Sequence, residues 1–186
     1  MAPTRRSLSL LALVVVARVS AACSSSGGGS GGMLGPGQAR LNIVIHDETS
    51  PAFSQANVTF SAIEVRDSQG VWVPVSGTFP MTIELLTLVN GKTLTLAAGA
   101  VPAGTYDRIR VTIAGSELVL ANGTTITITL PHAGVTVERM VSFTAVEGQP
   151  VTITLDFKVD LSFKLLEGME CQFEPEIDVE SVEHEH

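Results

Sequence analysis

The strongest constraint on the fold is a run of fifteen residues, Val151–Leu165, in which apolar and polar side chains alternate strictly. Alternation with period two turns one side chain toward a core and the next toward water, which is typical of a half-buried β-strand. At about 3.3 Å per residue this run would span about 50 Å, far beyond an ordinary strand. We therefore expect a bend or bulge within it, between Phe157 and Leu161.

The same alternation recurs along the chain from Ala39 onward. The other predicted strands are Leu41–Ile45, Val58–Val65, Val71–Val75, Thr82–Leu88, Thr93–Ala97, Tyr106–Ile113, Glu117–Leu120, Thr124–Leu130, Arg139–Val146 and Phe173–Val182. Turn signals such as Asn90-Gly91 and Asn122-Gly123 separate them. About nine to eleven short strands predict an all-β chain folded as a single antiparallel β-sandwich. The stretch Thr82–Ala97 leaves open a short helical turn.

The N-terminus has the order of an export signal. Arg5 and Arg6 precede the apolar stretch Leu8–Ala17, and small residues lead to Cys23. Such an order predicts a signal peptide over residues 1–22. The apolar stretch has about ten residues, whereas a membrane-spanning helix needs about twenty, so a removed signal fits better than a retained anchor. The "TRRSLSL" stretch also resembles a twin-arginine signal, so two export routes stay open.

Cys23 separates two ways of processing such a signal. Ordinary cleavage after Ala22 would leave a reactive thiol at the start of a secreted protein. The stretch also resembles a bacterial lipobox, which implies lipidation of Cys23, and multiple buried acyl chains anchor a protein firmly. Ser24–Gly32 consists of serine and glycine only, which predicts a flexible tether within residues 23–38. We therefore expect Cys23 to carry a lipid that attaches the chain to a membrane.

Charge and cysteine content limit the partners. The signal holds three of the 11 basic side chains, so 164 processed residues carry 8 basic and 19 acidic side chains, a net charge near −11. Nucleic-acid binding requires a positive footprint, which a chain of this charge lacks. Anionic membrane surfaces repel such a chain, so the lipid remains as the expected means of attachment. If Cys23 is lipidated, Cys171 has no partner for a disulfide. The alternative is a Cys23–Cys171 disulfide across a long loop.

Several stretches together resemble a known family. They are "ARLNIVIHDETSPAFSQANVTFSAIEVRDSQGVWVPV", "IELLTLVNGKTLTLAAGAVPAGTYDRIRVTI", "VTITLDFKVDLSF" and "FEPEIDV". Their order and spacing are similar to the domain-of-unknown-function family DUF4382 of bacterial and archaeal cell-surface lipoproteins. The family elements fall at Asp47, at Pro102 to Tyr106, and at Asp156 and Phe157. The resemblance implies a transthyretin-like or carboxypeptidase-regulatory-like sandwich with no established activity. In the "VPAGTYDRIRV" stretch, we expect Pro102 and Gly104 to form a turn and Tyr106 to anchor the next strand.

Residues with catalytic or ligand chemistry are few. The sequence contains neither a G-x-S-x-G elbow nor an H-E-x-x-H motif, so it predicts no catalytic residue, metal ligand or cofactor. In the "HDETS" turn, Asp47 and Glu48 offer oxygens to a cation, but a capping role is commoner for such an aspartate. Glu183 and His184 belong to an acidic tail that offers weak metal ligands. Trp72 is either a packed side chain, which we favour, or an exposed glycan contact.

These observations predict four regions: a lipoprotein signal peptide (1–22), a lipidated cysteine with a linker (23–38), a β-sandwich (39–182) and an acidic, histidine-containing tail (183–186). We expect a non-enzymatic binding or structural module of the bacterial cell envelope, at the outer membrane or cell surface, with a protein or glycan partner. The alternative is a ligand-binding domain that takes a metal or glycan through the Asp47/Glu48 turn or the acidic tail.

Overall fold

The computed structural model describes residues 34–47, 53–166 and 170–185, which belong to one compact unit, Met33–His186. The elements are β1 (Gln38–Asp47), β2 (Phe53–Asp67), β3 (Trp72–Pro74), β4 (Met81–Glu84), the 3₁₀ turn η1 (Leu85–Thr87), β5 (Leu94–Pro102), β6 (Gly104–Leu120), β7 (Thr125–Ile128), β8 (Val135–Ala145), β9 (Pro150–Phe157), α1 (Val159–Ser162), β10 (Phe163–Leu165), β11 (Cys171–Phe173) and β12 (Ile177–His184). In these residues no helix is both long and apolar enough to span a bilayer. The predicted all-β class is confirmed.

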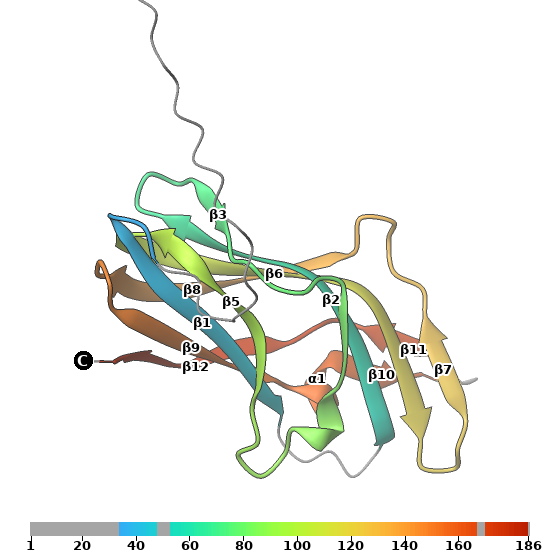
Figure 1. Cartoon of the computed structure of the whole chain (residues 1–186). Coiled ribbons are helices and arrows are strands. Elements are labelled where there is room, and N and C mark those ends of the chain that lie inside the picture. Colours follow the sequence, from blue (N-terminus) through green and yellow to red (C-terminus); the bar gives the residue numbers. More distant parts are fainter. Residues whose placement is uncertain (1–33, 48–52, 167–169, 186) are drawn as a thin grey trace, which may run out of the picture. The chain divides into compact units, whose positions relative to one another are not determined.

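A four-stranded sheet with the order β12-β9-β1-β5 forms one layer of the sandwich (Figure 1). β1 pairs antiparallel with β5 but parallel with β9, and β12 pairs antiparallel with β9. The sandwich is therefore antiparallel with one exception, the central β1–β9 pair. β1 and β9 are far apart in sequence, so the chain crosses the whole second layer before it returns to β1.

The second layer is a six-stranded sheet built on the long strands β2 and β6 (Figure 1). Both strands are longer than usual. An irregularity in their register divides β2 near Phe60 and β6 near Ala114. One half of the β2–β6 pair is flanked by β4 and β7, and the other half by β3 and β8. A bulge bends a strand and increases its twist. The bent β2–β6 pair therefore belongs to two half-sheets that have different flanking strands.

The core lies between the two layers and follows the alternation of the sequence. Leu41, Ile43 and Ile45 of β1 are fully buried, as are Phe60 of β2 and Phe157 of β9. The rings of Phe60 and Phe157 meet edge to face, with centroids 6.3 Å apart and an interplanar angle of 89°. This geometry is favoured for aromatic pairs, and it joins one sheet to the other.

The two edges of the four-stranded sheet are protected from pairing with other chains in different ways. On the β5 side, the Ala98 amide donates to the Ser76 carbonyl at 2.9 Å, and a Cβ on Gly99 would lie 2.9 Å from the Ser76 nitrogen. Glycine at 99 thus permits the close approach of the loop after β3. On the other side β12 carries acidic side chains and a bulge at Glu180, which are features that discourage pairing with other chains.

The predicted break in the Val151–Leu165 run is confirmed, and it takes the form of a helical turn. β9 ends at Phe157, α1 covers Val159–Ser162, and β10 begins at Phe163. The turn ends the alternation: Leu161, expected on the apolar face, is 56 % exposed. The short helical turn left open within Thr82–Ala97 is also present, as η1.

Several boundaries differ from the predicted ones, and the single strand predicted over Phe173–Val182 is divided into β11 and β12. β12 runs to His184, so Glu183 and His184 belong to the last strand and only Glu185 of the predicted tail is described outside it. The segments predicted as Tyr106–Ile113 and Glu117–Leu120 form the single strand β6. The irregularity near Ala114 shifts the buried positions of β6 from odd to even residue numbers. Alternation in the sequence therefore predicts two strands in place of one.

Tyr106 anchors β6 as predicted. Its hydroxyl donates to the Pro102 carbonyl at 2.7 Å, and its ring stacks on Phe143 of β8 at a centroid distance of 4.9 Å. A tyrosine hydroxyl bonded to backbone a few residues upstream is the arrangement of a tyrosine corner. Burial, and then the charge of Asp67, raise the pKa of this phenol.

Candidate functional site

A polar hollow of about 780 Å³ lies at the C-terminal end of β1, on the outer face of the four-stranded sheet. β1, β9 and β12 form its floor, and the connection from η1 to β5 forms one wall. Its lining residues are His46, Asp47, Asn90, Gly91, Thr93, Thr154, Glu180, Ser181 and Glu183. Three carboxylates and one imidazole line it with no lysine or arginine, so the hollow favours cationic or hydroxyl-rich groups over anions.

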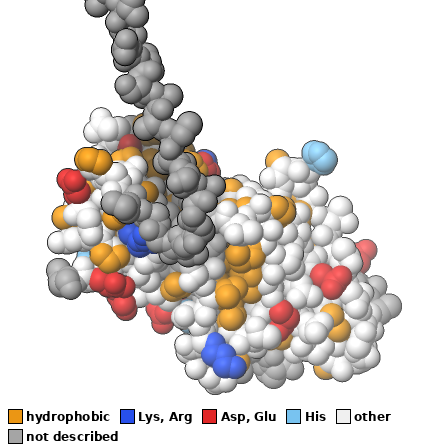
Figure 2. Space-filling model, in the orientation of Figure 1, with side chains coloured by type: hydrophobic (Ala, Val, Ile, Leu, Met, Phe, Trp, Pro, Cys, Tyr) orange, Lys and Arg blue, Asp and Glu red, His pale blue; other side chains and the backbone are white. Residues whose placement is uncertain are grey.

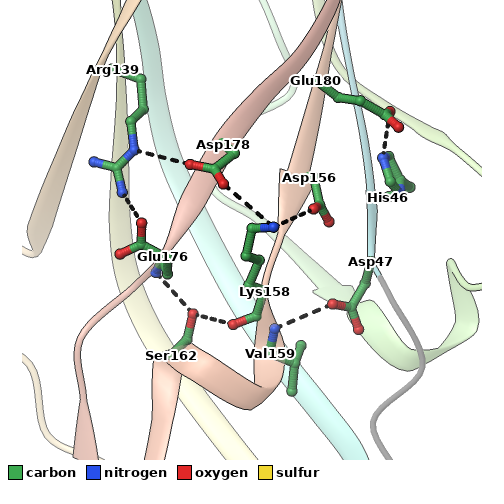
Figure 3. A network of polar contacts seen from close by, with 10 residues as sticks. All are labelled: His46, Asp47, Arg139, Asp156, Lys158, Val159, Ser162, Glu176, Asp178 and Glu180. Atoms are coloured by element: carbon green, nitrogen blue, oxygen red, sulfur yellow. Dashed lines mark hydrogen bonds and ion pairs between the residues drawn. The ribbon is translucent and has the colours of Figure 1, made fainter.

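The pair His46–Glu180 crosses the floor of the hollow. His46 Nε2 lies 2.7 Å from Glu180 Oε2, although β9 runs between their strands (Figure 3). Glu180 falls where the register of β12 shifts between Val179 and Ser181. A bulge re-aims the side chain of its extra residue, and here it brings a carboxylate to an imidazole two strands away.

A row of ionisable side chains continues from His46 across the same face. The register places His46 opposite Asp156, and Asp156 opposite Asp178. Lys158 Nζ lies 3.2 Å from Asp156 Oδ2 and 3.4 Å from Asp178 Oδ2 (Figure 3). These two carboxylates, Asp156 first, raise the pKa of the Lys158 ammonium. The lysine thus compensates two like charges that face each other on neighbouring strands.

Asp47 stabilises the turn α1 from a different strand. Its Oδ1 accepts a hydrogen bond from the Val159 amide at 3.2 Å, and the residue is only 2 % exposed. Lys158, which precedes α1, makes no side-chain capping bond. The first amide of α1 is a donor without an intrahelical acceptor, so Asp47 takes the capping role that its residue type favours.

The other end of α1 is held by Ser162, which is fully buried. Its hydroxyl donates to the Lys158 carbonyl at 2.7 Å and accepts from the Glu176 amide at 2.9 Å. Arg139 of β8 then lies 2.8 Å from Glu176 and 3.8 Å from Asp178 (Figure 3). A polar network therefore runs from α1 to the six-stranded sheet.

The structure places the sequence-predicted residues as follows. Asp47 lines the hollow, but its carboxylate caps α1; Glu48 and Cys23 lie outside the described residues. Within residues 34–47, 53–166 and 170–185, no three His, Cys, Asp or Glu side chains are arranged to hold a metal ion. Cys171 is half-buried, and burial raises the pKa of its thiol.

The favoured prediction for Trp72 is wrong. Val73 packs toward the core opposite the buried Val65, and Trp72 pairs with Arg66 on the outer face of the six-stranded sheet. Two arginine side chains of this sheet lie against the indole: Arg110 Cζ lies 4.1 Å and Arg66 Cζ 5.9 Å from the ring centroid. The "VWVPV" stretch is symmetrical in its valines, so alternation alone did not choose the face.

Glu180 and Lys158 were missed by reasoning from the sequence. A signal for Glu180 exists: Val179 and Val182 are three residues apart, which breaks the period-two pattern and marks a bulge. The alternation of the Val151–Leu165 run predicts only that Lys158 faces solvent. Its contact with Asp178 depends on the β9–β12 register, which no local pattern contains.

The fold and the hollow define a class: an all-β sandwich with a polar hollow at one end of its strand β1. Figure 2 shows charged and hydrophobic side chains in separate groups over the face drawn. The chain belongs to the family described as "Domain of unknown function (DUF4382)", whose family model matches residues 38–175. The resemblance in the sequence is thereby confirmed. No curated protein and no solved structure matches the chain.

Proposed function

We propose that this chain is a lipid-anchored protein of the bacterial cell envelope whose sandwich is a non-enzymatic binding or structural module. The observation that carries the proposal is the polar hollow at the end of β1. It gathers hydroxyl, amide and carboxylate groups from three strands and one loop, as small recognition sites do. No serine or cysteine of the described part of the chain hydrogen-bonds to the His46 ring, whose Nε2 contacts Glu180, so the groups suit recognition better than nucleophilic catalysis.

The position of the hollow supports presentation to a partner. β1 begins at Gln38, next to the predicted tether, and reaches the hollow at His46 and Asp47. Its ten residues span about 30 Å at the usual rise of a strand. A chain attached to lipid through Cys23 would therefore hold the hollow about 30 Å beyond the point where the tether meets the domain.

The anchor is tested by replacing Cys23 with serine. Full-length protein should incorporate labelled palmitate and sediment with membranes, and Cys23→Ser should do neither. Cys171→Ser is the matched control and should behave as the wild type. Membrane attachment that survives Cys23→Ser would contradict the anchor. Protease treatment of intact cells tests separately whether the domain is exposed at the cell surface.

The binding role is tested with a photo-reactive residue placed in the hollow at Thr154, with Thr127 of β7 as the control position. Both side chains are threonines on strands, and Thr127 is exposed and remote from the hollow residues. A discrete cross-linked species from Thr154 alone is expected in intact cells. Equal labelling from both positions would contradict a specific surface at the hollow.

The alternative is a domain that binds a metal or a glycan through the Asp47/Glu48 turn or the acidic tail. The capping bond of Asp47 argues against a metal at this position, because Oδ1 already accepts from the Val159 amide. Elemental analysis and thermal melts with calcium or zinc test it. A rise in melting temperature with either ion would favour the alternative over the proposal.

A further inference from the structure

Four side chains form a row across the outer face of the six-stranded sheet, whereas the hollow lies on the four-stranded sheet. The strand registers pair Trp72 with Arg66, Arg66 with Arg108, and Arg108 with Met140. Directly cross-strand residues share one face of a sheet, and the alternate residues Val65 and Ile109 are buried. The row, which we name the Trp72 row, therefore faces outward and spans about 14 Å across four strands.

Trp72 is held firmly at one end of this row. Arg110 Cζ lies 4.1 Å and Arg66 Cζ 5.9 Å from the indole ring centroid. Both arginines are themselves fixed by carboxylates. Arg66 makes two hydrogen bonds to Asp107 at 2.8 and 2.6 Å, and Arg110 reaches Glu64 at 2.8 and 2.7 Å. The half-buried indole is thus preorganised, which lowers the entropic cost of a contact with a ligand.

Arg108, in the middle of the row, differs from its neighbours. No hydrogen bond or ion pair joins its guanidinium to a residue in the described part of the chain; it acts on Asp107 only by attraction at longer range. Arg108 is half-buried, and a guanidinium without a carboxylate partner is suited to bidentate binding of a ligand carboxylate.

Met140, at the far end, is 78 % exposed, the most exposed of the large hydrophobic side chains that the structure describes. The row thus joins an aromatic ring, an available positive charge and an apolar contact on one flat surface.

We infer that the Trp72 row binds a carboxylate-bearing polysaccharide. The negative face of an aromatic ring attracts the weakly positive C–H groups of a sugar ring, and Arg108 supplies a partner for a uronate carboxylate. Arg66 and Arg108 lie on β2 and β6, which are paired on both sides within the sheet, so a ligand over the middle of the row is held by side chains and not by strand addition. The inference is independent of the hollow and of the anchor.

Fluorescence provides a direct test, because Trp72 is the one tryptophan of the chain. Full-length protein in detergent is titrated with polygalacturonate, with dextran as the uncharged polymer. Polygalacturonate should change the emission and bind saturably, whereas dextran should do neither. In affinity electrophoresis with the same polymers, Trp72→Ala and Arg108→Ala should each weaken binding at least about tenfold, as the loss of a hot-spot side chain does.

Arg40→Ala, on the other sheet, is the matched control and should bind as the wild type; thermal melts verify that each variant is folded. An unchanged emission spectrum, or equal affinities of the Arg108→Ala and Arg40→Ala variants, would overturn the inference. Dextran sulfate and polyglutamate distinguish other ligands. Equal binding of dextran sulfate without dependence on Trp72 would reveal simple ion exchange, and Trp72-dependent binding of polyglutamate would indicate an acidic protein partner; either result overturns it.

Discussion

Replacement of Asp47 by alanine separates a structural role of this residue from a metal-binding one. The substitution removes the buried acceptor 3.2 Å from the Val159 amide and leaves the first amide of α1 without that bond. A hydrogen bond to a charged group contributes about 1.5–3 kcal/mol, and loss of a cap costs about 0.5–2 kcal/mol. These figures describe the same contact, so we expect the free energy of unfolding to fall by about 2 kcal/mol.

For a domain of this size, a loss of 2 kcal/mol lowers the melting temperature by about 4–8 °C. Urea unfolding followed by circular dichroism measures the free energy, and Asp47→Asn is the matched control. The amide oxygen of asparagine can still accept from Val159, so this variant should lose clearly less stability than Asp47→Ala. Equal stability of Asp47→Ala and the wild type would refute the capping role. So would a chelator that destabilises the wild type but leaves Asp47→Ala unchanged.

Three further predictions concern the sandwich itself. Tyr106→Phe should cost about 1 kcal/mol in urea unfolding through loss of the bond to Pro102. Because the pKa of Tyr106 is raised in the folded protein, the neutral phenol stabilises the fold fully below about pH 10, and this stability is lost as pH rises through the folded pKa. The absorbance of the phenolate of this one tyrosine should therefore show a titration above pH 10. A titration at the ordinary pKa of tyrosine would contradict the burial argument. Gly134→Ala should cost about 3 kcal/mol or more, since Gly134 has φ +76° and an added Cβ would press against the Ile113 carbonyl oxygen; a thermal melt equal to that of wild type would contradict this. Burial raises the Cys171 pKa, so iodoacetamide should modify this thiol slowly in native protein and rapidly in urea; equal rates would show that the thiol is accessible in the fold.

Much of the fold could be predicted because alternation is a local property. The burial of Val151, Ile153, Leu155 and Phe157 follows directly from the sequence pattern. The break after Phe157 was predictable too, since no ordinary strand spans the whole run. The role of Tyr106 followed from the turn chemistry of Pro102 and Gly104 and from the apolar positions after it.

The candidate site was much less predictable, because its contacts join residues distant in sequence. His46 and Glu180 are 134 positions apart, and Asp47 and Val159 are 112 apart. The pattern showed that an aspartate in "HDETS" suits a capping role, but it did not show which helix would be capped. The parallel pairing of β1 with β9 carries that information, and parallel neighbours need a crossover connection that local alternation does not record.

The sequence by itself determined which side chains are buried in most strands, because period-two alternation and a hydrophobic core act on near neighbours. Only the tertiary structure decided which strands are adjacent, which face Trp72 occupies and which carboxylates surround Lys158. Those features depend on register between distant segments, and a shift of one residue in register would exchange the faces of a strand while its sequence pattern stayed the same.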